Sequence, residues 1–236
     1  MIKFVGSVGL ALALTFSCAN AAITTEDQAQ IEKIIDDYVS NHPEVILRAM
    51  KKFENDQNQR NQEAINQLID SYRSSNTLPM LGDKQSKHFI IEFYDYNCGY
   101  CKTMEPLFHK ANKEDDTQII YVNIPILGEA SKQLSEYGQA IYLVDKDKYF
   151  QFHDYLMSRP TRNFDREAIK VLCKDLKIDF EAVEKMLKSE LPQKQIRKSI
   201  EDSMNLNITG TPYLIIDGKE VRGAIRNYEQ LKSMLN

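Results

Sequence analysis

The sequence is short of long apolar runs and of massed basic residues. Beyond its first twenty residues it has no run of about 18 apolar residues, so nothing in the body of the chain predicts a bilayer-spanning helix. Its 30 lysines and arginines are scattered among 34 acidic residues, for a net charge of −4, which argues against nucleic acid as the main partner. The 236 residues, 42% hydrophobic, suffice for one substantial domain with room for an appendage.

The apolar run at the N-terminus has the pattern of a secretory signal. Lys3 supplies the positive charge, residues 4–16 the apolar segment, and Ala19-Asn20-Ala21 the small-residue cleavage site. We therefore expect residues 1–21 to be removed on export. Two alternatives stay open: a retained membrane anchor, for which the run is short, and lipid attachment at Cys18.

Cysteines are also scarce, and cleavage of the signal would leave Cys98, Cys101 and Cys173. Three cysteines do not make the even framework of a secreted disulfide scaffold. Zinc needs four ligands, but no second close cysteine pair is present and the four histidines are scattered. A structural disulfide across so small a loop would stabilise weakly. We therefore predict that the close pair is kept for its reactivity and that Cys173, on an apolar helix face, is a small core residue.

Two helical segments follow the signal. Helical spacing of apolar residues predicts a helix over about residues 25–40, and Asn41-His42-Pro43 starts a second that could continue to about Arg73. The second helix is amphipathic at both ends and wholly polar at residues 54–63. We interpret residues 22–75 as an oligomerisation stalk whose apolar ends meet another copy of the chain. The alternative is a helical hairpin folded back on its own domain.

A polar connector at residues 74–87 marks the expected boundary of a second domain, residues 76–236. A strand at residues 88–96, a helix at about 101–112 and a strand at 117–124 predict a parallel βαβ unit. Residues 130–206 have helical patterning throughout and the length of an insertion. A strand at 213–216, an Asp217-Gly218 turn, a second strand and a short helix close the chain. The fold class is therefore α/β.

The Cys98-Gly99-Tyr100-Cys101 segment falls where the first strand ends and a helix begins. The thiolate is the reactive form of cysteine, and the free amides and dipole of a helix N-terminus stabilise it. Two intervening residues leave Cys101 one turn further on, able to attack a mixed disulfide formed by Cys98. We predict Cys98 as the nucleophile and Cys101 as the buried resolving thiol. No cofactor beyond their redox-active disulfide is expected.

Glu92 lies within an apolar strand, six residues before Cys98. It shares a strand face with Ile90 and Tyr94, so we expect it to be at least half buried, with its pKa raised by desolvation. Beneath the dithiol it could take and return the proton of Cys101, which makes it a third candidate catalytic residue. The alternative is a carboxylate that reaches solvent at the end of the strand.

Gly210-Thr211-Pro212 directly precedes the strand at 213–216. Together with an exported CxxC pair on a βαβ unit, it resembles the thioredoxin superfamily and, more closely, its bacterial periplasmic Dsb branch. The resemblance covers about residue 87 to the C-terminus and implies a thioredoxin fold with a helical insertion. It also implies a cis-proline at Pro212, pairing of the Thr211 backbone with substrate by β-augmentation, and substrate contacts at Gly99 and Tyr100.

The detailed pattern combines features of two Dsb types. The helical insertion and Glu92 resemble the oxidase DsbA, whereas Gly99-Tyr100 with Thr211-Pro212 is similar to the isomerase DsbC. The segment from Asn41 to Val45 and the helical N-terminus resemble DsbA-like proteins that oligomerise, including the ScsC (copper-sensitivity suppressor) group.

The resemblance implies a periplasmic thiol–disulfide oxidoreductase, and the dipeptide with Thr211 favours an oligomeric disulfide isomerase or reductase. Expected partners are unfolded or misoxidised secreted proteins, a membrane redox partner, and other copies of the chain in a dimer or trimer. The alternative within the enzyme class is a DsbA-like oxidase that donates its own disulfide. The alternative of another class is a copper(I)-handling protein, because thiolates are soft ligands.

Overall fold

The computed structural model describes residues 24–161 and 164–235. Its internal contacts divide the chain into two compact units, Met1–Asp56 and Gln57–Asn236. The predicted signal peptide, with Cys18 and the cleavage site, lies outside the described residues. None of the helices in the described part is long and apolar enough to cross a membrane.

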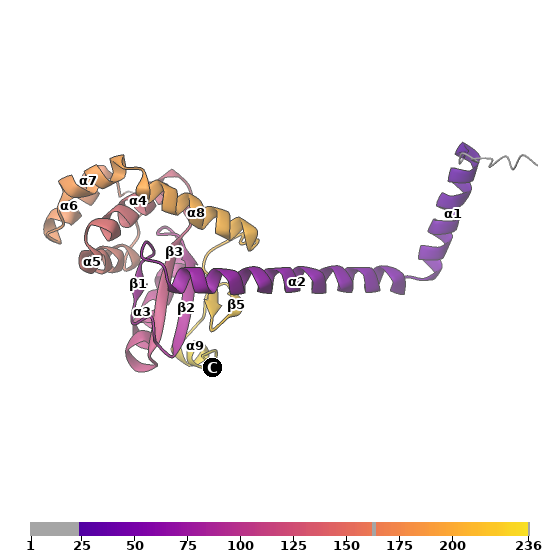
Figure 1. Cartoon of the computed structure of the whole chain (residues 1–236), viewed down its shortest axis with the longest axis horizontal. Coiled ribbons are helices and arrows are strands. Elements are labelled where there is room, and N and C mark those ends of the chain that lie inside the picture. The colour runs from indigo at the N-terminus through magenta and orange to yellow at the C-terminus, as the bar shows by residue number, and fades with distance from the viewer. Residues whose placement is uncertain (1–23, 162–163, 236) are drawn as a thin grey trace, which may run out of the picture. The chain divides into compact units, whose positions relative to one another are not determined.

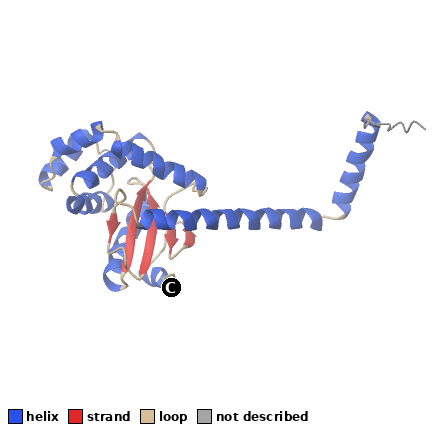
Figure 2. Ribbon diagram, in the orientation of Figure 1, coloured by secondary structure: helices blue, strands red, loops and turns tan. Residues whose placement is uncertain are grey.

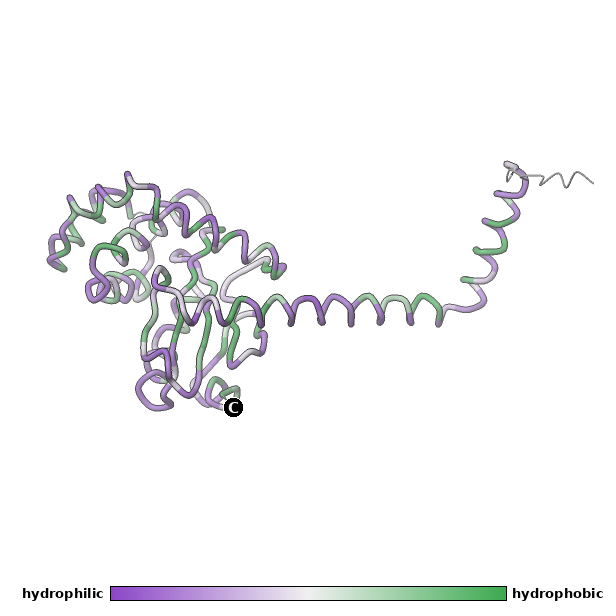
Figure 3. Tube along the Cα trace, viewed as in Figure 1, coloured by the Kyte–Doolittle hydropathy of each residue, from purple (hydrophilic) through white to green (hydrophobic). Residues whose placement is uncertain are grey.

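The first unit holds α1 (Thr25–Asn41) and the first part of α2 (Glu44–Arg73). The Thr24 side chain accepts from the Asp27 amide, and the Asp27 carboxylate accepts from the Thr24 amide, which satisfies the free amides where α1 begins. Both predicted helices are therefore confirmed. Hydrophobic residues recur along the chain of this unit (Figure 3). Eight of its large apolar side chains are 45–67% exposed: Ile31, Ile34, Ile35, Tyr38, Ile46, Leu47, Met50 and Phe53.

The second unit is built on a five-stranded sheet in the order β1-β3-β2-β4-β5 (Figures 1 and 2). The parallel pair β2 (His88–Tyr94) and β3 (Thr117–Asn123) is joined by α3 (Gly99–Glu114), which confirms the predicted βαβ unit. Next to β2 runs β4 in the antiparallel direction, and the turn at Asp217-Gly218 leads into β5. The bounds of the three remaining strands are β1 (Met80–Leu81), β4 (Tyr213–Ile216) and β5 (Lys219–Arg222).

Most of the described residues between β3 and β4 are helical, as predicted for the insertion, and a short helix follows β5. They are α4 (Glu129–Val144), α5 (Lys146–Met157), α6 (Arg166–Asp175), α7 (Phe180–Lys188), α8 (Leu191–Asn205) and, after β5, α9 (Tyr228–Lys232). The fold is thioredoxin-like with a helical insertion.

Both faces of the sheet are covered. Ile90 and Tyr94 of β2 pack in a large apolar cluster with α3 and the insertion helices. The alternate residues Ile91 and Phe93 pack in a second cluster that includes α2 and β4. All four side chains are at most 2% exposed. The strand is therefore apolar on both sides because each side has a cover.

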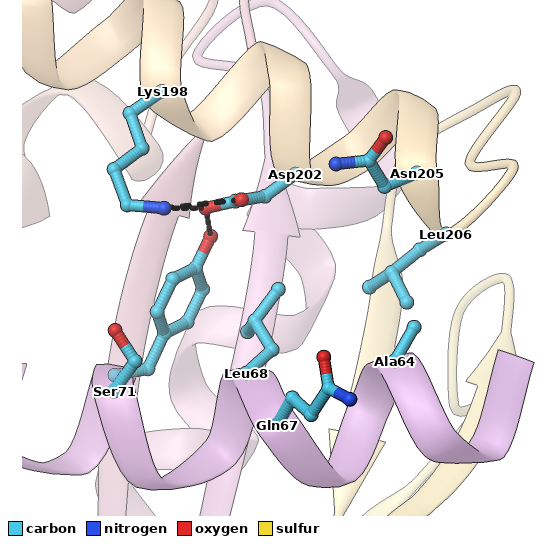
Figure 4. A pocket seen from close by; sticks show the side chains of 9 residues that line it. Ala64, Gln67, Leu68, Ser71, Lys198, Asp202, Asn205 and Leu206 are labelled. Carbon is cyan, nitrogen blue, oxygen red and sulfur yellow. Dashed lines mark hydrogen bonds and ion pairs between the residues drawn. The ribbon is translucent and has the colours of Figure 1, made fainter.

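The cover of the second cluster is the latter part of α2. Ile65 and Tyr72 of this helix are only 1% and 2% exposed. The Tyr72 hydroxyl donates to the Asp202 carboxylate of α8 at 2.7 Å. Lys198, one turn earlier on α8, pairs with the same carboxylate at 2.8 Å (Figure 4). This half of α2 is thus an integral layer of the second unit.

The predicted domain boundary at residues 74–87 is wrong for these compact units, because the division falls inside α2, between Asp56 and Gln57. Part of the polar stretch at 54–63 that suggested a free stalk bonds instead to the β4–β5 hairpin. Asn61 Nδ2 donates to Glu220, and Gln62 Nε2 donates to the Gly218 carbonyl oxygen at 3.1 Å. Polar side chains dock here by hydrogen bonds, which a hydropathy pattern does not detect. The connector itself contains β1, a strand of two residues.

Candidate active site

The predicted dithiol lies at the N-terminus of α3. Cys98 is the N-cap residue, and its Sγ accepts from the Cys101 amide at 3.5 Å. The backbone of Cys98 is itself fixed, because its amide donates to the Asp95 carbonyl oxygen at 2.9 Å. Cys98 is 6% exposed and Cys101 is fully buried. The sequence pattern predicts this arrangement, with the first sulfur facing the free helix amides and the second inside the core.

The two thiols differ strongly in acidity. Hydrogen bonding to Cys101 lowers the pKa of Cys98 to about 5, with further help from Thr211 and the amides of Cys101 and Tyr100, against the opposing effect of partial burial. Burial raises the pKa of Cys101 far above its usual range, and the nearby Cys98 and Glu92 add to that effect. At pH 7 Cys98 is therefore mainly thiolate, whereas Cys101 keeps its proton.

The Thr211–Pro212 peptide bond is cis and lies against the dithiol. The Thr211 carbonyl oxygen is 3.3 Å from Cys98 Sγ, and the buried Pro212 carbonyl accepts from the Gly223 amide at 3.0 Å. A hollow lined by Thr211 and Pro212 opens beside this loop. The structure thus brings together two segments more than a hundred residues apart, as the resemblance implied.

Gly99 and Tyr100 lie on the exposed side of the same site. The Tyr100 side chain is 70% exposed, and a Cβ placed on Gly99 would meet nothing within 4 Å. A second hollow on this side is lined by Gly99, Lys102 and Thr161 among others. Burial lowers the pKa of Lys102 to about 8. These positions leave room for an extended segment of another protein.

Glu92 is fully buried on β2, and neither of its carboxylate oxygens has a hydrogen-bond partner in the described part of the chain. Desolvation raises its pKa well above the usual range, and the charges of Glu105 and Cys98 act in the same direction. The alternative that Glu92 reaches solvent is therefore wrong. Burial therefore increases the affinity of this carboxyl group for a proton.

The sequence analysis did not predict a cluster of charged side chains between α3 and α5, formed by Glu105, His109, His153 and Asp154. Burial opposes ionisation of Glu105, yet the charge of His153 and hydrogen bonds from His109, His153 and Tyr121 lower its pKa to about 2. Hydrogen bonds to Asp154 and Glu105 raise the pKa of His109 to about 10. The four-residue spacing of Glu105 and His109 on a helix was a usable signal, whereas nothing in the sequence linked His153 to them.

One set of side chains in the described residues has the types and closeness of metal ligands, namely Glu105, His109 and Asp154, whose ligand atoms lie within 4.8 Å of one another. Ion pairs already account for this set. His109 Nε2 is 3.2 Å from Glu105 and 3.1 Å from Asp154, so the imidazolium forms an ion pair with each acid. Cys173 lies apart from these groups, fully buried on α6, where burial raises its pKa to about 11.

Two family models match the chain. The DSBA-like thioredoxin domain matches residues 89–236, and the N-terminal domain of the copper resistance protein ScsC matches residues 27–60. Among curated proteins, the disulfide bond formation protein D of Bacillus subtilis is 23% identical over 180 residues, 72% of this chain and 81% of that protein.

Solved structures agree with these matches. A linker-deletion mutant of Proteus mirabilis ScsC covers 92% of this chain and 97% of its own, at 25% identity and a TM-score of 0.67. The thiol–disulfide exchange protein α-DsbA2 of Wolbachia pipientis covers 74% and 94%, at 28% identity and a TM-score of 0.66.

Proposed function

The chain belongs to the family of DSBA-like thioredoxin domains and is a thiol–disulfide oxidoreductase of the DsbA/ScsC type, and from this premise we propose that it is an oligomeric disulfide isomerase or reductase of exported proteins. The observation that carries the chemistry is the inequality of the two thiols. Cys98 ionises near pH 5 and is partly accessible, whereas burial keeps Cys101 protonated.

Exchange begins when the Cys98 thiolate attacks a disulfide of the client protein. The client S–S bond breaks, a mixed disulfide forms at Cys98 Sγ, and one client sulfur leaves as thiolate. In isomerisation a client thiolate attacks the mixed disulfide again and forms a different client disulfide. In reduction Cys101 attacks Cys98 Sγ, the client leaves reduced, and the two cysteines become oxidised to a disulfide.

Cys101 must lose its proton before it attacks, and Glu92 is the residue proposed to take it. Glu92 is buried, its oxygens have no hydrogen-bond partner among the described residues, and its charge affects the acidity of Cys101. A raised pKa increases the affinity of the carboxylate for a proton, which is what an acceptor of the Cys101 proton requires. This step matters for release of the client rather than for its capture.

Thr211 and Pro212 are proposed to hold the client beside Cys98. The backbone of Thr211 would pair with an extended segment of the client, as one strand pairs with another. The two hollows beside the dithiol leave space for side chains of that client segment. The proximity of the Thr211 carbonyl to Cys98 Sγ would place the client disulfide in reach of attack.

Self-association is proposed through the first unit. Eight large apolar side chains there are 45% exposed or more, an apolar surface that a monomer would leave in water. Joining two or three copies would bury it and would bring several dithiols to one client. The N-terminal sequence pattern supports export to the periplasm, where clients and a membrane redox partner would be met.

A dithiol oxidase is the second candidate, and the acidity of Cys98 favours it. A low thiolate pKa stabilises the reduced pair and so makes its disulfide a stronger oxidant. A reduction potential near about −120 mV would support the oxidase, and a clearly more negative one the isomerase or reductase. For copper(I) handling, the raised pKa of Cys101 is unfavourable, because the metal needs both thiolates.

The test is reactivation of scrambled ribonuclease by the full chain. Cys98→Ser should abolish activity, whereas Cys101→Ser should trap mixed disulfides that are visible on non-reducing gels. Cys173→Ala, which changes a cysteine outside the site, serves as the control and should behave like the wild type. Trapping by Cys98→Ser instead of Cys101→Ser would reverse the assigned roles, and full activity of both variants would refute the proposal.

A further inference from the structure

Lys102 follows directly after Cys101 on α3 and takes no part in the exchange reaction described above. Its amide donates to the Cys98 carbonyl oxygen at 3.3 Å, so it lies one helical turn after Cys98. Residues four apart on a helix share a face, and the Lys102 side chain therefore leaves α3 on the side of Cys98. The side chain is half-buried, and a lysine in that position needs partners for its ammonium group.

The ammonium group of Lys102 has two partners at the end of α5. Its Nζ donates to the Leu156 carbonyl oxygen at 2.6 Å and to the Thr161 hydroxyl at 3.3 Å. Leu156 lies in the last turn of α5, where the carbonyl groups have no acceptor role within the helix and carry the negative end of its dipole. A cation from α3 therefore caps the C-terminus of α5.

Thr161 extends this contact to the dithiol loop. Its hydroxyl lies 2.9 Å from both the Tyr96 carbonyl oxygen and Asn97 Oδ1, either of which accepts its single proton. Tyr96 and Asn97 immediately precede Cys98. The end of α5 is thus held to the chain on both sides of the two cysteines, by Thr161 before them and by Lys102 after them.

The charge of Lys102 also bears on the dithiol. Burial lowers the pKa of Lys102 to about 8, and the negative charges of Cys101, Asp95 and Cys98 oppose that shift. At pH 7 the ammonium form is therefore still the main form. Cys98 is a thiolate in the reduced pair, whereas both sulfurs are uncharged in the disulfide. The attraction between Lys102 and Cys98 is therefore present only in the reduced protein.

We propose that Lys102 is a positioning residue that fastens the end of α5 to the dithiol loop and whose charge favours the reduced form of the Cys98–Cys101 pair. Oxidation by glutathione disulfide forms the bond between the two cysteines and breaks the S–S bond of glutathione. Two electrons and the Cys101 proton pass to glutathione, which takes one further proton from water. A cation beside the thiolate opposes this step, so the pair is a stronger oxidant with Lys102 than without it.

The inference concerns the equilibrium of the pair, and it applies equally to an isomerase, a reductase or an oxidase. Lys102→Met tests it, because methionine keeps a long unbranched stem without the charge. The redox equilibrium of the full chain with glutathione should shift about tenfold toward the disulfide, which corresponds to a potential about 30 mV more negative. Lys102→Arg, which keeps the charge, should stay within about twofold of the wild type. The control is Lys113→Met, which removes an exposed lysine from the last turn of α3 and should also stay within about twofold.

Two further variants separate charge from fastening. Lys102→Gln keeps a donor for Leu156 but no charge, so it should shift the equilibrium as Lys102→Met does, and it serves in its place if that chain does not fold. Thr161→Val keeps the charge and removes the hydroxyl, so it should lower the melting temperature of reduced and oxidised chains alike, by about 2–4 °C.

An unchanged equilibrium in the two uncharged Lys102 variants, or an equal shift in Lys102→Arg, would overturn the role of the charge. A Thr161→Val chain that melts like the wild type would overturn the fastening. Failure of the wild type to reactivate scrambled ribonuclease would contradict the proposed function instead, because the glutathione equilibrium does not depend on a protein client.

Discussion

The two parts of α2 share one helix but have opposite relations to solvent. Before Gln57 the large apolar residues Ile46, Leu47, Met50 and Phe53 are 45–67% exposed, whereas Ile65 and Tyr72 further on are almost fully buried. Both parts are amphipathic and both are helical. Burial is therefore decided by the partner that an apolar stripe meets, not by the stripe. The latter part covers the sheet, and the first part is available for another chain.

Two N-terminal truncations, compared with each other, should give the largest difference in stability. A chain that begins at Gln57 should fold, whereas one that begins at Asn76 should lose its cooperative melting transition. The second truncation removes Ile65 and Tyr72, whose burial contributes about 2–5 kcal/mol each to the free energy of unfolding. The total free energy of unfolding of a domain is only about 5–15 kcal/mol. Circular dichroism melting curves distinguish the two. A stable chain beginning at Asn76 would refute the assignment of this part of α2 to the second unit.

Charging the exposed part tests self-association. Met50→Glu with Phe53→Glu should convert an oligomer to a monomer, because it places two carboxylates in the apolar contact. Light scattering should show the change in mass, and activity on scrambled ribonuclease should fall by about a hundredfold, the scale of lost avidity. Lys51→Gln, a polar exchange at the neighbouring position, is the control. A wild type that is already monomeric at micromolar concentration would favour the oxidase.

Glu92→Gln should act on the second unit alone. It removes the proposed proton acceptor of Cys101, so release of a mixed disulfide should slow by about a hundredfold while the first attack is nearly unchanged. Stopped-flow kinetics on the full chain and on the chain beginning at Gln57 should give the same factor. A normal rate of release between about pH 6 and 8 would leave Glu92 with no role in catalysis.

The acidity of Cys98 should be the same in both lengths of chain. With a pKa of about 5, its thiolate is the main form above that pH and is lost below it. The rate with glutathione disulfide should therefore be flat above about pH 6 and fall about tenfold per unit below pH 5. Thiolate absorbance against pH provides an independent measurement. A midpoint near 8.5 would mean that the helix amides do not stabilise this thiolate.

The dithiol and the βαβ unit could be predicted because short-range patterns specify them. A CxxC pair between an apolar strand and a helix carries its own geometry, and the apolar run in β2 shows a strand with two covers. The division of α2 could not be predicted, because it depends on hydrogen bonds from Asn61 and Gln62 to a hairpin more than 150 residues away. The link between Glu105 and His153 was missed for the same reason, because only the tertiary fold brings these residues of α3 and α5 together.

Tyr72→Phe is the smallest change that tests how the latter part of α2 docks on the second unit. It keeps the buried ring and removes the hydroxyl that donates to Asp202, which retains Lys198 as a partner. The loss should therefore stay near the value of one hydrogen bond, about 1 kcal/mol, and lower the melting temperature by about 2–4 °C. Tyr38→Phe on α1 is the matched control, because the Tyr38 side chain is 53% exposed. Loss of this exposed hydroxyl should leave the melting temperature unchanged. Equal shifts in the two variants would mean that the contact with α8 contributes nothing to stability, and the docking of this half of α2 would then rest on apolar burial alone.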